Sequence, residues 1–163
     1  MTVPHLRDHS PGRVRRLAHL GPFGLTRLAL SWLLLGLTRA AIALLPFSTL
    51  RRLLGEGRTD AAPLPPATDR EARQSSRIGH SVRQAAAHTP WRSDCYPQAL
   101  TAHLHLRLAR VPHTVSFGLR RAERGLTAHV WIAAADGIVT GGDPRDYTTV
   151  GAFTWLPGSQ RRT

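Results

Sequence analysis

Cys95 is the only cysteine of the chain, and the residues around it are typical of a helix start. Ser93 or Asp94 can cap a helix, and Pro97 is tolerated only in a first helical turn. We therefore expect Cys95 at the positive end of a helix dipole, where a thiolate is favoured. The unpaired N–H groups of that first turn could stabilise an oxyanion. This placement suits a cysteine nucleophile.

His129 is the best placed of the nine histidines to act as a base for that thiol. Residues 127–134 alternate as a strand, with Val130 and Ile132 on one face and His129 and Trp131 on the other. A cysteine nucleophile needs either a lowered pKa or a neighbouring base, and a neutral imidazole can supply the base. We predict that His129 has this role.

A carboxylate that orients His129 depends on the loop between its strand and the next one. A two-residue loop at 136–137 would pair His129 with Pro144. A three-residue loop at 135–137, with the glycine in the left-handed conformation, would pair His129 with Asp143. We predict the second register, because Asp143 can then orient and stabilise the imidazole. A bulge at the following glycines could shift the count, and the alternative carboxylates are Asp136 and Asp146.

Each of these residues also has an ordinary structural interpretation. A lone cysteine is often a small buried apolar residue, a strand histidine is often only half-exposed, and Asp-Gly or Asp-Pro often marks a turn. Their order along the chain favours catalysis. Two alternatives stay open, namely an amidase or acyltransferase of the same fold and a non-catalytic partner-binding protein. One cysteine makes a poor metal site and His103 and His105 do not share a helix face, so we expect no metal and no cofactor.

Helical patterns precede strand patterns, which predicts an α+β fold. We expect residues 1–54 to form an apolar, arginine-rich helical segment broken near Pro46, residues 55–68 to be a proline- and glycine-rich linker, and residues 69–163 to form the catalytic domain. The expected helices are 69–87 and 94–110, and the expected strands are 113–119, 127–134, 138–140 and 150–155.

The formal charge of +12 comes from 22 arginines and no lysine. It favours acidic partners, but no stretch interleaves arginine with aromatic residues as single-strand binders do, so we expect no nucleic acid. The lone thiol and the absence of a secretory layout indicate the cytoplasm.

The longest uncharged run, residues 28–38, is too short for a membrane span. A helical hairpin packed in the core is expected, with peripheral membrane contact through residues 24–54 as the alternative.

Four segments resemble the stand-alone leader peptidase of bacterial lasso-peptide biosynthesis, a family with the transglutaminase-like (papain-like) fold. They are residues 89–100, Val111-Pro112 before a strand, residues 128–131 and Asp136-Gly137. The resemblance covers about residues 70–155, and it departs from the usual pattern at Val130 and Ala133.

The resemblance implies a cysteine protease that removes the leader from a ribosomally made precursor peptide. Cys95 would be the nucleophile, His129 the general base and then acid, and Asp143 the orienting carboxylate. The implied partners are the precursor, a small leader-recognition protein and an ATP-dependent lasso cyclase. Candidate substrate-binding residues around the expected site, of which the aromatic ones fit a core equally well, are Trp91, Tyr96, Gln98 and Trp131.

Overall fold

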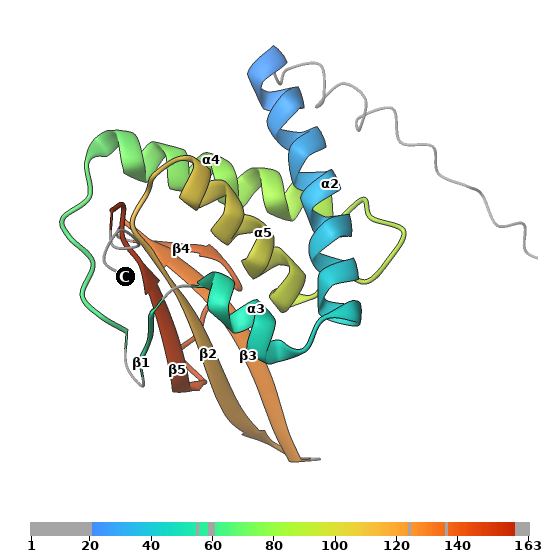
Figure 1. The fold of residues 1–163 in the computed structure, drawn as a ribbon, viewed down its shortest axis with the longest axis vertical. Coiled ribbons are helices and arrows are strands. Elements are labelled where there is room, and N and C mark those ends of the chain that lie inside the picture. The colour runs from blue at the N-terminus through green and yellow to red at the C-terminus, as the bar shows by residue number, and fades with distance from the viewer. Residues whose placement is uncertain (1–20, 55, 59–60, 124, 136, 159–163) are drawn as a thin grey trace, which may run out of the picture.

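The computed structural model describes residues 21–54, 56–58, 61–123, 125–135 and 137–158. Within these residues, helices cover one face of an antiparallel sheet (Figure 1). The helices are α2 (Pro22–Leu44), α3 (Phe47–Leu54), α4 (Asp69–Ala86) and α5 (Cys95–Leu108). The strands are β1 (Glu56–Arg58), β2 (His113–Ala122), β3 (Gly125–Ala134), β4 (Gly137–Thr140) and β5 (Thr148–Trp155). The predicted α+β order is confirmed.

Local signals in the sequence set the ends of the helices. Thr68 caps α4 through a reciprocal capping box with Glu71, in which each side chain binds the other residue's backbone N–H. Pro46 separates α2 from α3, as expected. The helix α5 begins at Cys95 and ends where Arg110 adopts a left-handed conformation with φ of 57°. The predicted position of Cys95 at a helix start is therefore confirmed.

The strands are ordered β1-β5-β2-β3-β4 in the sheet. The long pairing of β2 with β3 runs from His113↔Ala134 to Ala122↔Gly125. The short strand β1 lies inside the predicted linker and pairs with β5, for example through Gly57↔Phe153. Three residues without apolar alternation give no strand signal, which is why the sequence did not predict this strand.

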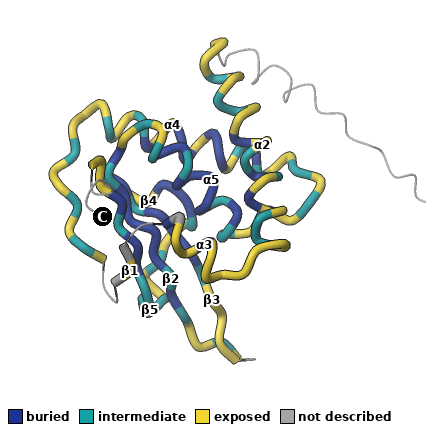
Figure 2. The backbone as a smooth tube through the Cα atoms, in the orientation of Figure 1, coloured by how far each residue is buried: buried dark blue, intermediate teal, exposed yellow. Residues whose placement is uncertain are grey.

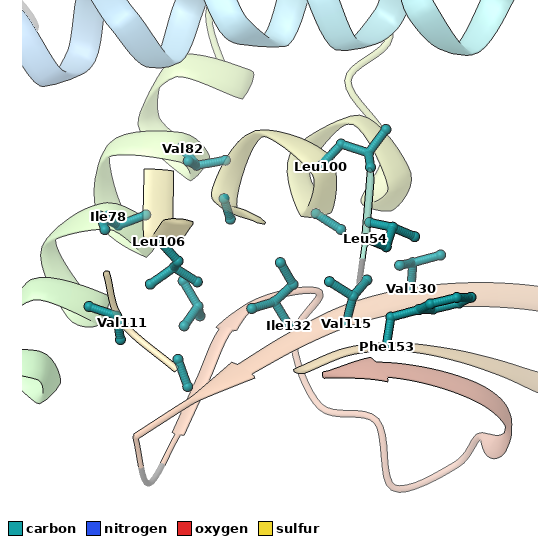
Figure 3. Packing of buried hydrophobic residues seen from close by; sticks show 14 residues of the cluster. Leu54, Ile78, Val82, Leu100, Leu106, Val111, Val115, Val130, Ile132 and Phe153 are labelled. Carbon is teal, nitrogen blue, oxygen red and sulfur yellow. The ribbon is translucent and has the colours of Figure 1, made fainter. Parts of the chain in front are cut away.

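The core lies between the sheet and the helices α4 and α5 (Figures 2 and 3). On β3, Val130 and Ile132 are buried in this core, as the strand alternation predicts. On α5, Ala99, Ala102 and Leu106 share one face of the helix and are fully buried in the same core. The alternation of β3 consequently turns His129 and Trp131 toward the opposite face of the sheet.

The helix α2 packs on α4 and α5 through a few polar side chains and one leucine. Its buried residues are Ser31, Leu35 and Thr38. By length and composition α2 could cross a membrane, and only 17% of its most apolar window is buried. The length of the uncharged run, residues 28–38, is therefore a poor measure of the length of this helix. The helix α2 continues through Arg27 and Arg39 to a length of 23 residues.

Candidate active site

The loop before Cys95 is held by its own hydrogen bonds. The hydroxyl of Thr89 lies 2.9 Å from the hydroxyl of Ser93, and the side-chain amide of Gln98 donates to the Ser93 carbonyl at 2.7 Å. Asp94 occupies the N-cap position, although its side chain makes no capping hydrogen bond. Cys95 is the first residue of α5, is a free thiol and is partly buried against the core. The thiol is therefore fixed at the N-terminal end of the helix, where the dipole favours its anion.

His129 makes a hydrogen bond to a backbone carbonyl. Its Nε2 lies 2.5 Å from the carbonyl oxygen of Gly141, in the segment that follows β4. Because a carbonyl only accepts hydrogen bonds, Nε2 carries the proton and Nδ1 carries the lone pair. The ring also lies 4.7 Å from the ring of Tyr147 and 6.1 Å from that of Trp131. The neutral imidazole is thus held in the tautomer that can accept a proton at Nδ1.

The first turn of α5 and the middle of β3 meet in one region of the molecule. The ring of Tyr96 lies 5.8 Å from that of Phe117, and Phe117 pairs across the sheet with Val130, the neighbour of His129. The side chains of Cys95 and His129 are not joined by a hydrogen bond, because His129 faces away from the helices. The ladder between β3 and β4 begins only at Ile132↔Thr140, and beside His129 the edge of β3 lies against the segment of Gly141, which bonds the His129 ring. The structure brings the two elements together but not the two reacting atoms.

Asp143 does not contact His129. Its carboxylate accepts hydrogen bonds from Nε of Arg145 at 2.7 and 3.0 Å and from the Arg145 backbone N–H at 3.1 Å. These hydrogen bonds lower the pKa of the Asp143 carboxyl. Asp146 lies near Arg120 at 3.7 Å, and Asp136 is outside the described residues. The role of Asp143 as the orienting carboxylate therefore stays a prediction.

The predicted three-residue loop between β3 and β4 is wrong. Ala134 pairs with Gly137, so the loop has two residues, and the left-handed conformation falls on Ala135 with φ of 52°. A bulge near Val139 then shifts the pairing to Ile132↔Thr140, the register that a three-residue loop would have given.

Two contacts from α4 explain the bulge. Arg83 donates to the Val139 carbonyl at 2.6 Å, and a Cβ on Gly79 would lie 2.4 Å from the same oxygen. The helix therefore holds this carbonyl out of the strand ladder. Beyond the bulge Gly141 and Gly142 have φ of 98° and 66°, which ends β4 before Asp143.

The four predicted substrate-binding residues lie in different surroundings. Trp91 packs against Trp32 of α2 with ring centroids 5.1 Å apart. The ring of Tyr96 lies between Phe47 and Phe117, and burial raises the pKa of its hydroxyl. The side-chain amide of Gln98 donates to the Ser93 carbonyl. Trp131 is buried on the same face as His129, and all four substrate-binding roles stay predictions.

Sequence reasoning missed the residue that orients His129. The Gly141 carbonyl has no side-chain signature, although a Gly-Gly pair after a short strand is a signal for an irregular backbone. It also missed Tyr147, which stacks beside His129 and lies under the guanidinium of Arg120 at 5.0 Å. Among the described residues, no group of three or more histidine, cysteine, aspartate or glutamate side chains is arranged to hold a metal ion.

Comparison with known proteins agrees with this architecture. The family model of the transglutaminase-like superfamily matches residues 40–152, which include Cys95 and His129. No curated protein and no solved structure matches the chain. The match covers more than half of the sequence, from the end of α2 into β5. The chain therefore belongs to the transglutaminase-like superfamily.

Proposed function

We propose that this protein is a cysteine peptidase that removes the leader from a ribosomally made lasso-peptide precursor. The observation that carries the proposal is a thiol at the first residue of α5 together with an imidazole, on a strand of the same domain, whose Nδ1 can accept a proton. The membership of a superfamily that includes cysteine proteases and acyltransferases supports it. The four motif segments that resemble lasso leader peptidases carry the choice of substrate.

The reaction would proceed by acyl transfer to water. Nδ1 of His129 takes the proton of Cys95, and the sulfur attacks the carbonyl carbon of the scissile peptide bond. The N–H groups of the first turn of α5 stabilise the oxyanion, and His129 returns the proton to the leaving amine. Water then hydrolyses the thioester with His129 acting as base.

This mechanism requires His129 and Cys95 to approach within hydrogen-bond reach, about 3 Å. His129 lies on the face of the sheet turned away from the helices and is bonded to the Gly141 carbonyl, so this approach requires a rearrangement of the His129 side chain or of the segment around Gly141. Catalytic hydrogen bonds are often longer before substrate binds and shorten in the complex. We expect bound peptide to bring the two side chains together.

Mass spectrometry of a precursor peptide tests the reaction. A lasso-peptide precursor is incubated with the enzyme and a small leader-recognition protein, and we expect separate leader and core masses that add up to precursor plus one water. Cys95→Ala should abolish release, and His129→Ala should slow it by at least about a hundredfold. An amine adduct in the product would instead indicate an acyltransferase, and unchanged release by Cys95→Ala would refute the mechanism.

The single thiol also allows a test without a known substrate. Iodoacetamide can modify only Cys95, so the mass increase reports directly on this residue. We expect alkylation in the native protein at pH 7 and slower alkylation when His129 is changed to alanine. A native Cys95 that reacts only after unfolding would favour the non-catalytic alternative.

We also propose that the enzyme works in the reducing cytoplasm together with the recognition protein and the cyclase.

A further inference from the structure

The helix α2 leaves more of its apolar side chains exposed than an ordinary surface helix does. Of its three buried residues, Ser31 and Thr38 are polar and the third is Leu35. Ser31 lies 3.0 Å from Nε2 of His105, and Thr38 lies 3.2 Å from the hydroxyl of Thr101. Surface helices normally bury an apolar stripe and expose polar residues. On α2, hydroxyl groups provide part of the attachment to the domain beside Leu35, and many of the apolar residues are left exposed.

The outward face of α2 is a continuous apolar surface, which we call the α2 face. Its residues repeat at spacings of three, four and seven, so they lie on one side of the helix, and they are Phe23 (84% exposed), Leu30 (39%), Leu33 (54%), Leu37 (57%) and Leu44 (81%). Trp32 and Phe47, of α2 and α3, extend the exposed apolar surface at the side and beyond the C-terminal end. An exposed apolar surface of this extent marks an interaction site. Figure 2 shows the exposed outer side and the partly buried inner side of α2.

The charged residues of the segment that contains α2 and α3 are all positive. Between residues 9 and 55 the sequence has seven arginines and no acidic residue. Of the described arginines in this stretch, Arg39, Arg51 and Arg52 are exposed. Beside Phe23 an open pocket of about 640 Å³ is lined by Arg27 and Arg77, and no acidic residue is present among the described residues that line it. Apolar surface flanked by cations complements an anionic lipid surface.

The attachment of α2 to α4 and α5 determines how α2 would be oriented on an anionic lipid surface. A helix that spans a bilayer is surrounded by lipid, whereas α2 is hydrogen-bonded to α4 and α5 along its inner side, as in the contact of Ser31 with Ser81 at 3.2 Å. Only the outer half is free to enter the boundary between headgroups and acyl chains.

We propose that the α2 face, with α3 beside it, docks this protein in-plane on an anionic membrane surface. The proposal does not depend on the peptidase function, because it uses none of the site residues. Vesicles are sufficient to test it, without any substrate.

Co-sedimentation of the full chain with vesicles gives the first test. We expect binding to an equal mixture of phosphatidylcholine and phosphatidylglycerol, weaker binding to phosphatidylcholine alone, and a decrease as salt is added. The variant Leu33→Gln/Leu37→Gln should bind at least about tenfold more weakly. The matched control Leu126→Gln/Ile138→Gln removes exposed apolar groups on the β-strands and should bind like the wild type.

Three outcomes would overturn the proposal, and a stability control accompanies them. Absence of vesicle binding, or equal binding by the two double variants, would refute docking through the α2 face. Protein that resists extraction by alkaline carbonate would indicate a membrane span. A dimer that dissociates when Leu33 and Leu37 are replaced, without vesicle binding, would assign the face to a second copy. Unchanged urea midpoints of both variants would show that folding is not the cause.

Discussion

The tautomer of the neutral His129 ring is set by the hydrogen bond from its Nε2 to the Gly141 carbonyl. A carboxylate partner would both fix the tautomer and stabilise the imidazolium, whereas the Gly141 carbonyl only fixes the tautomer. His129 is therefore oriented by the backbone and not by a carboxylate. Cysteine nucleophiles can act without an orienting carboxylate, because a neutral imidazole can still accept the proton of the thiol.

The first prediction at this scale concerns Asp143. Since its carboxylate is engaged by Arg145 and not by His129, Asp143→Asn should lower kcat/KM for leader cleavage by less than about tenfold. Loss of an orienting triad carboxylate costs about 10⁴-fold in kcat. A loss approaching that size would show that Asp143 leaves Arg145 during turnover. The variant Arg145→Gln is the matched control, because it releases the carboxylate without removing it.

The second prediction concerns the backbone that holds His129. A Cβ at Gly141 would lie 2.5 Å from Cβ of Trp131 and 2.7 Å from the Val130 carbonyl. Gly141→Ala must therefore displace the carbonyl that His129 binds, and kcat should fall by about a hundredfold. The backbone strain should also lower the free energy of unfolding by about 1–3 kcal/mol in urea titrations.

Gly142→Ala is the control for this change. Gly142 also has positive φ, but a Cβ there has nothing within 4 Å. It should cost about 1 kcal/mol of stability from conformation alone and leave kcat within a few-fold of wild type. Equal losses of activity in the two variants would mean that the position of the Gly141 carbonyl is not what matters.

At the scale of elements, the end of α5 stores conformational strain. The N–H of Val111 bonds to the Leu106 carbonyl at 2.9 Å and that of Arg110 to the Arg107 carbonyl at 3.0 Å, which is the Schellman pattern. The left-handed residue of that pattern is usually glycine, but here it is Arg110. Leu106 and Val111 are fully buried, so the core holds this turn in place.

Arg110→Gly should raise the free energy of unfolding by about 0.5–1 kcal/mol. Glycine adopts φ of 57° without the Cβ clash, and this gain exceeds its greater freedom in the unfolded chain. Urea titration measures the change. Arg110→Ala removes the same side chain but keeps the strain, so it should not stabilise the protein, and equal stabilisation by both variants would contradict the explanation.

Elements with strong periodicity were predictable from the sequence, and backbone irregularities were not. The helix start at Cys95 and the alternation around His129 follow from local rules, because capping residues and apolar spacing act over a few residues. The bulge at Val139 arises from Arg83 and Gly79 on α4, sixty residues or so earlier in the chain. A contact at that sequence distance leaves no local signal, so the partner of His129 could not be inferred.

At the scale of the whole molecule, α2, α5 and the sheet are joined by buried histidines. His105 on α5 reaches Ser31 of α2. His113 at the start of β2 binds the Val111 carbonyl through Nδ1 at 2.8 Å, and its Nε2 lies 2.8 Å from Nδ1 of His103. Since Nδ1 of neutral His113 donates to the carbonyl, its Nε2 accepts from His103. A second proton on His113 would therefore require His103 to change its tautomer.

Stability should consequently fall in mild acid. Burial lowers the pKa of His113 to about 4, with Arg107 adding to the effect and the Val111 carbonyl opposing it. Burial and the charge of Arg27 lower the pKa of His105 to about 4 as well. Between these values and the ordinary pKa of about 6.5, the unfolded chain binds protons that the folded chain does not. Stability is therefore fully present above pH 6.5 and is lost as the pH falls toward 4, by up to about 3 kcal/mol for His113.

Urea midpoints measured from pH 7.5 to 4.5 test this coupling, and we expect them to be constant at the upper end and to decrease steadily below pH 6.5. His105→Gln separates the two histidines, because the glutamine amide can replace Nε2 toward Ser31 and has no proton to gain. Its midpoint should depend less steeply on pH than that of the wild type, while the part due to His113 remains. A wild-type midpoint that is the same at pH 7 and 4.5 would mean that these imidazoles are protonated inside the fold, and α2 would then be attached through charged rather than neutral partners.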